Sequence, residues 1–180
     1  IEIPNLKIYK KWLSVSYMPL EIGFSLTSGM KVFSFSYPPL RGLDAYENLY
    51  AGLKKACDFS ISAIKKNYKN YDYAYIHIKE TDIPGHDNKP IEKKEMIEYI
   101  DKTLFDFLRK FAPPYKIKVA VTGDHSTPCK LKSHSDDPVP VLLYNNSLIK
   151  EKHFSEKECR LGSLGRMNGV DLLSKIGFLK

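Results

Sequence analysis

The sequence predicts an α/β fold in which a mostly parallel sheet is covered by helices on both faces. Short β-like apolar runs alternate with amphipathic segments along the 180 residues, a pattern typical of βα units. Apolar residues make up 43% of the chain and charged residues 27%, a balance that suits one folded domain with a buried core. In such sheets ligands bind beyond the carboxyl ends of the strands, so polar clusters that follow strands are candidate sites.

The first half of the chain is expected to contain two strands and two helices. The strands are placed at 11–17 and 31–36, and the helices at 20–28 and 45–68. Gly29 is suited to end the first helix, because glycine readily adopts the left-handed conformation found after helix C-termini. Asp44 is a candidate N-cap of the long helix, and Glu47 follows at the spacing of a capping box. Cys57 falls on the apolar stripe of that helix and is expected in the core.

The second half is expected to add three strands and two helices. The strands are placed at 71–79, 116–122 and 139–144, and the helices at 91–111 and 169–176. Apolar residues of the 91–111 helix recur at helical spacing, and the pair Pro113-Pro114 stops it. Its apolar face is expected to comprise Ile97, Ile100, Leu104, Phe107, Leu108 and Phe111. Prolines in and beside the 139–144 run place that strand at a sheet edge or at a strand start.

Charge and composition argue against a nucleic-acid or membrane partner. The net charge is +7, but the 24 lysines are scattered singly and in pairs, mostly on polar helix faces. No apolar run approaches the roughly twenty residues that span a bilayer. Three widely spaced cysteines favour a reducing cytoplasm over a disulfide framework. We see no secretion signal, and the start at Ile1 suggests a fragment, a processed product or a protein that begins further upstream.

Two clusters of Asp and His follow predicted strands, one within 81–87 and one within 122–134. The candidate ligands are Asp82, His86, Asp124, His125 and His134. Two such clusters at two strand ends are what a two-metal centre needs, and Asp with His suits Mn²⁺, Zn²⁺ or Co²⁺. The sequence therefore predicts a metal centre at these strand ends.

Each cluster also has a simpler interpretation. The polar residues of 81–87 could form a turn that hydrogen-bonds its own backbone, and His134 could be a surface residue of a Ser/Asp loop. If the metal centre exists, Asp87 could orient a ligating histidine, and Cys129 could touch an ion or substrate.

The remaining polar residues near the clusters are expected to be structural. Ser126 and Thr127 adjoin a candidate ligand and are expected to hold the loop, because no serine here is placed like a nucleophile that opens a helix. His77 lies inside a predicted strand and is expected to be packed and hydrogen-bonded, whereas His153 is expected at the surface.

Three stretches together carry a resemblance to a known family. They are 77–87, 122–128 and 134–140, and the ending 154–166 is also similar. They resemble the cofactor-independent phosphoglycerate mutases of the archaeal type, within the alkaline phosphatase superfamily. The likeness covers essentially all 180 residues and is weakest before about Tyr71. It implies an incomplete alkaline-phosphatase-like domain: residues 1–180 would be its C-terminal part, with the N-terminal part and a separate inserted domain absent.

The resemblance implies a ligand set and a place for the nucleophile. One metal would be held by Asp82, His86 and His134, and a second by Asp124 and His125. The second would also take an aspartate and the nucleophilic serine from the N-terminal part. The serine is therefore expected upstream of residue 1, and no catalytic residue is identified in this chain. Arg41 lies in a turn that departs from the glycine-rich turn expected there; it is a candidate substrate ligand or a solvated loop residue.

The activity implied for the complete enzyme is the glycolytic interconversion of 3-phosphoglycerate and 2-phosphoglycerate through a phosphoserine intermediate. Its expected cofactors are two divalent ions, Mn²⁺ first and Zn²⁺, Co²⁺ or Mg²⁺ as alternatives, without 2,3-bisphosphoglycerate. The isolated chain is expected to be inactive. The alternatives are a phosphate or sulfate ester hydrolase of the same superfamily and a non-catalytic metal- or partner-binding module. A homo-oligomer is left open.

Overall fold

The computed structural model describes residues 5–6, 10–39, 44–146 and 153–179. The chain divides into two compact units. The first comprises 1–84 and 89–107, and the second comprises 85–88 and 108–180. Within the described ranges, no helix is both long enough and apolar enough to cross a membrane.

The first unit contains a three-stranded parallel sheet. Its strands are β1 (Trp12–Val15), β2 (Lys31–Phe33) and β3 (Tyr73–Ile76), in the order β2-β1-β3. The central strand pairs in parallel with both neighbours, so that Leu13 lies opposite Lys31 on one side and Ala74 on the other. The carboxyl ends of all three strands therefore lie at one edge of the sheet. The parallel sheet was predicted, although each strand is shorter than the run that indicated it.

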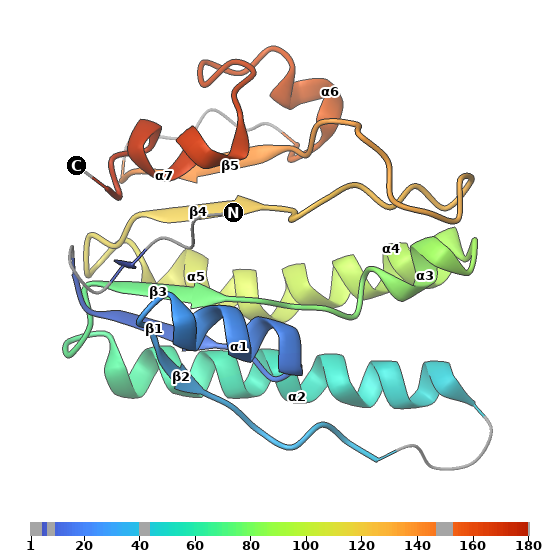
Figure 1. Ribbon diagram of the computed structural model, residues 1–180, viewed down its shortest axis with the longest axis horizontal. Helices are drawn as coiled ribbons and strands as arrows, with labels where there is room; N and C mark the ends of the chain where they lie inside the picture. The colour runs from blue at the N-terminus through green and yellow to red at the C-terminus, as the bar shows by residue number, and fades with distance from the viewer. Residues whose placement is uncertain (1–4, 7–9, 40–43, 147–152, 180) are drawn as a thin grey trace. The chain divides into compact units, whose positions relative to one another are not determined.

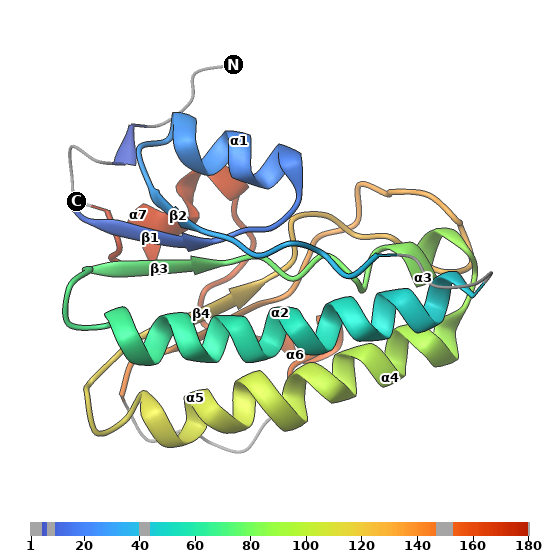
Figure 2. The ribbon, with the colours of Figure 1, turned by 90° about the horizontal axis from the view of Figure 1, so that it is seen from below.

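Helices cover both faces of this sheet, α1 (Pro19–Thr27) on one face and α2 (Ala45–Asn67) on the other (Figures 1 and 2). Successive residues of β1 point to opposite faces. Leu13 and Val15 pack with Ala63 of α2 in a buried apolar cluster. On the opposite face, the hydroxyl of Ser14 lies 2.8 Å from that of Ser25 in α1. Because both faces are covered, β1 is buried along its whole length.

The helix α2 begins where its sequence predicts. Asp44 is the N-cap, and its carboxylate accepts hydrogen bonds from the backbone N–H groups of Tyr46 and Glu47. Cys57 is fully buried on the inner face of the helix, as expected.

The second long helical segment differs from the single helix expected at 91–111. It consists of α4 (Pro90–Ile100), a π-helical turn (Asp101–Phe105) and α5 (Asp106–Phe111). Its apolar face also differs, because Met96 is fully buried whereas Ile97 is 51% exposed. A π turn takes more residues than an α turn, so a stripe counted at 3.6 residues per turn does not stay on one face across it.

The second unit contains an antiparallel pair of strands, β4 (Val119–Thr122) and β5 (Val141–Tyr144). Their pairing departs from the mostly parallel sheet that was expected, because here the two strands are joined directly by one long loop, without a helical crossover. Among the described residues after β5, three short helical elements follow along the chain (Figure 1). They are α6 (Glu156–Cys159), a 3₁₀ turn (Gly169–Asp171) and α7 (Leu172–Lys175), the last two at the place of the helix expected at 169–176.

Candidate metal centre

The loop between β4 and β5 folds back on itself and carries three of the five candidate ligands. Thr122 pairs with Val141, so residues 123–140 form the loop. Within it Ser126 and Ser135 form an isolated antiparallel bridge, in which the Ser135 N–H donates to the Ser126 carbonyl at 3.0 Å. The bridge holds the two arms of the loop side by side.

The bridge also explains why two histidines meet. In an antiparallel pair, residues adjacent to the bridged ones lie on the opposite face of the ribbon. His125 precedes Ser126 and His134 precedes Ser135, so both imidazoles lie on the same face. Their ring centroids are 3.7 Å apart. The ring of His86 lies 5.0 Å from that of His134, which brings three imidazoles together in the second unit.

Neighbouring groups orient two of these rings. Thr127, which is 5% exposed, places its hydroxyl oxygen 3.0 Å from Nδ1 of His125 in a hydrogen bond. His86 donates from Nδ1 to the backbone carbonyl of Lys132 at 3.2 Å. Metal-ligating histidines commonly bond the second ring nitrogen in this way, which fixes the tautomer and the ring plane.

The two carboxylate candidates lie beside histidines. Asp124 accepts a hydrogen bond from the His125 backbone N–H at 3.0 Å, and its other oxygen lies 3.4 Å from Nε2 of His125. Asp82 lies just before α3 (Ile83–His86), the short helix that ends in His86. One ligand atom each from Asp82, His86 and His134 lie within 4.8 Å of one another. These donors are oxygen and imidazole nitrogen, the set expected for borderline divalent cations.

Residues 51–178 match the family described as the metalloenzyme superfamily. The chain belongs to this superfamily. The donor set and the family match support divalent metal binding, without identifying the metal.

Relatives with a curated description include phosphoglycerate mutases, as the resemblance predicted. The 2,3-bisphosphoglycerate-independent phosphoglycerate mutase of Pyrococcus horikoshii is 41% identical over 107 residues, which are 58% of this chain and 26% of that protein. The "Probable 2,3-bisphosphoglycerate-independent phosphoglycerate mutase" of Thermosipho melanesiensis is 35% identical over 165 residues, 84% of this chain and 40% of that protein. The chain thus spans well under half the length of these relatives.

A solved structure is similar over the whole chain. The PH0037 protein from Pyrococcus horikoshii matches this metalloenzyme-superfamily chain with a TM-score of 0.74 and 30% identity, covering 100% of this chain and 53% of that one. The similarity supports the α/β fold class and the interpretation of this chain as part of a larger protein.

The other polar residues singled out in the sequence are mostly structural. His77 is packed as expected: its Nδ1 lies 2.9 Å from the Tyr75 hydroxyl, and its Nε2 lies 3.8 Å from a carboxylate oxygen of Glu21. His153 is exposed, as expected. Ser126 holds the loop, because its hydroxyl donates to the Asp137 carbonyl at 3.2 Å. Arg41 lies outside the described residues.

Sequence reasoning missed Glu80, a carboxylate that is 1% exposed and follows β3. Its charge, added to the larger effect of burial, raises the pKa of Tyr17 far above the ordinary value, so the Tyr17 hydroxyl stays protonated. The sequence signal for Glu80 is weak, because a charged residue a few positions beyond a strand is usually solvated.

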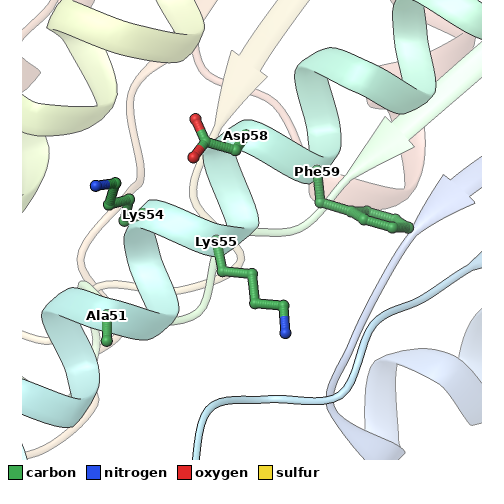
Figure 3. Close-up of a pocket in the computed structure, with 5 residues that line it drawn as sticks. All are labelled: Ala51, Lys54, Lys55, Asp58 and Phe59. Atoms are coloured by element: carbon green, nitrogen blue, oxygen red, sulfur yellow. The ribbon is translucent and has the colours of Figure 1, made fainter.

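A shallow hollow of about 440 Å³ lies on α2 (Figure 3). It is lined by Ala51, Lys54, Lys55, Asp58 and Phe59. Lys55 is tied to the segment after β2, because its ammonium donates to the Ser36 carbonyl at 3.0 Å. The hollow contains none of the predicted ligands, and the Asp/His arrangement is the stronger candidate site.

Proposed function

We propose that this chain is part of a 2,3-bisphosphoglycerate-independent phosphoglycerate mutase, which interconverts 3-phosphoglycerate and 2-phosphoglycerate. The observation that carries the proposal is the gathering of His86, His125 and His134, with Asp82 and Asp124 beside them, in a chain whose relatives have that name. The substrate would be the small phosphorylated glycerate, and no 2,3-bisphosphoglycerate would be required. A reducing cytoplasmic setting agrees with the odd number and wide spacing of Cys57, Cys129 and Cys159.

The five ligands are assigned to two ions. Asp82, His86 and His134 would hold one, which agrees with the 4.8 Å grouping of their ligand atoms. Asp124 and His125 would hold the second, which agrees with their 3.4 Å separation. Mn²⁺ is the proposed native ion, and Zn²⁺ or Co²⁺ suit the same donors.

This chain would position the metals rather than supply the nucleophile. When bound, two divalent ions stabilise negative charge on a transferred phosphoryl group. Two serines of the loop are engaged elsewhere, since Ser135 donates to a carboxylate oxygen of Asp137 at 2.8 Å and Ser126 bonds the carbonyl of the same residue. As the family resemblance implies, the nucleophilic serine that forms the phosphoserine would come from a segment outside these 180 residues.

The test is a coupled assay for conversion of 3-phosphoglycerate to 2-phosphoglycerate with added Mn²⁺. It is run on the full-length polypeptide encoded by the gene and on the 180-residue chain. Activity in the full-length protein alone is the expected result. His134→Ala should lower metal affinity at least tenfold and abolish turnover, and His153→Ala, an exposed histidine of the same unit, is the matched control.

Two outcomes would contradict the proposal. Release of inorganic phosphate without 2-phosphoglycerate would identify a hydrolase of the same superfamily. Bound metal without either product in the full-length protein would favour a non-catalytic metal-binding module.

A further inference from the structure

Glu80 is a buried carboxylate to which the proposed function gives no role. It follows β3 and precedes Asp82 by two residues, and it is 1% exposed. Its Oε2 accepts a hydrogen bond of 2.6 Å from the hydroxyl of Tyr17. Burying a carboxylate is costly unless hydrogen bonds compensate for lost hydration, so this placement needs a physical reason.

The Tyr17 hydroxyl makes two contacts at the exit of β3. It donates to the Glu80 side chain, and it accepts from the Lys79 backbone N–H at 3.0 Å. The hydroxyl oxygen of Tyr17, which follows β1, is thus bonded to both Lys79 and Glu80, which follow β3. Because β1 and β3 are paired in parallel, this tie lies at the carboxyl edge of the sheet.

Tyr17 is itself held firmly. The residue is 7% exposed, and its ring stacks on Phe35 and Tyr37 at centroid distances of 4.6 and 5.9 Å. The phenol of Tyr37 packs directly over Gly52 of α2, where a β-carbon would overlap with it. Tyr17, which follows β1, is therefore held by the segment after β2, and that segment packs in turn on α2.

The anchored residue Lys79 in turn holds Asp82. The Asp82 backbone N–H donates to the Lys79 carbonyl at 3.2 Å, closing a tight turn. The Lys79 ammonium lies 3.5 Å from a carboxylate oxygen of Asp82. Glu80 is therefore linked to Asp82 by a chain of interactions. Glu80 bonds the Tyr17 hydroxyl, that hydroxyl bonds the Lys79 backbone, and the backbone and side chain of Lys79 contact Asp82.

We propose that Glu80 and Tyr17 are positioning residues that set the metal affinity of Asp82 by fixing the turn on which it lies. The inference rests on the proposed assignment of Asp82 as a metal ligand. Neither residue is among the proposed metal ligands, so both act through the Lys79 turn.

The test is a Co²⁺ titration of the full-length protein, followed by the visible absorption of the bound ion. Tyr17→Phe keeps the stacked ring but removes the hydroxyl, and Glu80→Ala removes the acceptor. Each substitution should lower the affinity for one of the two Co²⁺ ions about tenfold and alter the absorption spectrum of that ion. Glu80→Gln retains an acceptor oxygen and should stay within about twofold of the unsubstituted protein, because the bond to Tyr17 is kept.

The matched control is Tyr50→Phe, which removes another tyrosine–carboxylate bond of the first unit, from Tyr50 to Glu95 at 2.7 Å, on α2 and α4. It should leave both Co²⁺ affinities unchanged. Thermal unfolding in the presence of a chelator shows whether any variant fails to fold. A loss of affinity in Glu80→Gln equal to that in Glu80→Ala would overturn the role of the hydrogen bond.

Failure of this inference can be told apart from failure of the proposed function. Asp82→Asn should weaken the same Co²⁺ equivalent as Tyr17→Phe. If Asp82→Asn weakens Co²⁺ binding while Tyr17→Phe and Glu80→Ala do not, the positioning role is wrong and the ligand stands. If Asp82→Asn changes nothing, the ligand assignment itself is wrong.

Discussion

The rings of His125 and His134 lie with their centroids 3.7 Å apart at an interplanar angle of 32°, although the two residues are nine positions apart in the chain. Their contact depends on the Ser126–Ser135 bridge, which aligns the two arms of the 123–140 loop. In the proposed assignment the two histidines serve different ions. A substitution that moves one of these rings would therefore disturb the ligands of both ions.

Thr127→Val tests this relationship. The substitution removes the hydroxyl that bonds Nδ1 of His125 at 3.0 Å while nearly preserving side-chain shape. We expect metal affinity to fall about tenfold, the lower end of the range for groups that orient a metal ligand. Isothermal titration with Mn²⁺ measures it. Thr27→Val, at an exposed threonine of α1, is the control, and equal affinities in the two variants would exclude an orienting role.

Gly52→Ala and Gly23→Ala should change stability in opposite directions. A β-carbon at Gly52 would overlap with the Tyr37 ring, so we expect a loss of about 1–3 kcal/mol in the free energy of unfolding. Gly23, in α1, has nothing within 4 Å of an added β-carbon, so alanine should stabilise by roughly 0.5–1 kcal/mol. Urea unfolding of both variants measures the difference. Equal effects would mean that Tyr37 does not pack over α2 in solution.

Asp44→Ala should destabilise the protein by about 1 kcal/mol, because it removes the side chain that accepts from the N–H groups of Tyr46 and Glu47. Asp58→Ala, at an exposed position inside the same helix, removes the same charge without removing a cap. Chemical denaturation followed by circular dichroism compares the two variants. A smaller loss at Asp44 than at Asp58 would contradict the cap.

Cys57 should be the least reactive of the three cysteines. It is fully buried, and burial raises the pKa of its thiol to about 11. Its reactive thiolate is therefore scarce at pH 8 and becomes abundant only as the pH rises past that value. Titration with a chromogenic disulfide at pH 8 should modify Cys129 and Cys159 in the native protein, and Cys57 only after unfolding. Rapid modification of Cys57 without denaturant would indicate local opening of α2.

Local signals predicted the parts of the fold that depend on neighbouring residues. Asp44 was expected to begin α2 because a cap acts within one helical turn, and it does. Gly29 was expected just after α1, and it has a positive φ of 80°. Both features follow from hydrogen bonding and sterics that a short stretch of sequence contains.

Pairing and packing between distant residues could not be predicted in the same way. A run such as Val141–Tyr144 has the same composition whether its partner is parallel or antiparallel, so the direction of β5 was not accessible. The buried bond between Glu80 and Tyr17 joins residues 63 positions apart, and no local pattern reports it. The candidate ligands could be proposed from the sequence because metal chemistry restricts the donor types, and their assignment stays a prediction.

The Ser126–Ser135 bridge closes a short internal loop within the longer connection between β4 and β5. A metal ion that binds only when this loop is closed stabilises the closed loop. The stabilisation is about 2.7 kcal/mol when the free metal concentration is a hundred times the Kd. The backbone amides of this loop should therefore exchange with deuterium more slowly in the metal-loaded protein than after chelation. Metal supply would then govern how often this segment opens to solvent, and with it its exposure to proteases.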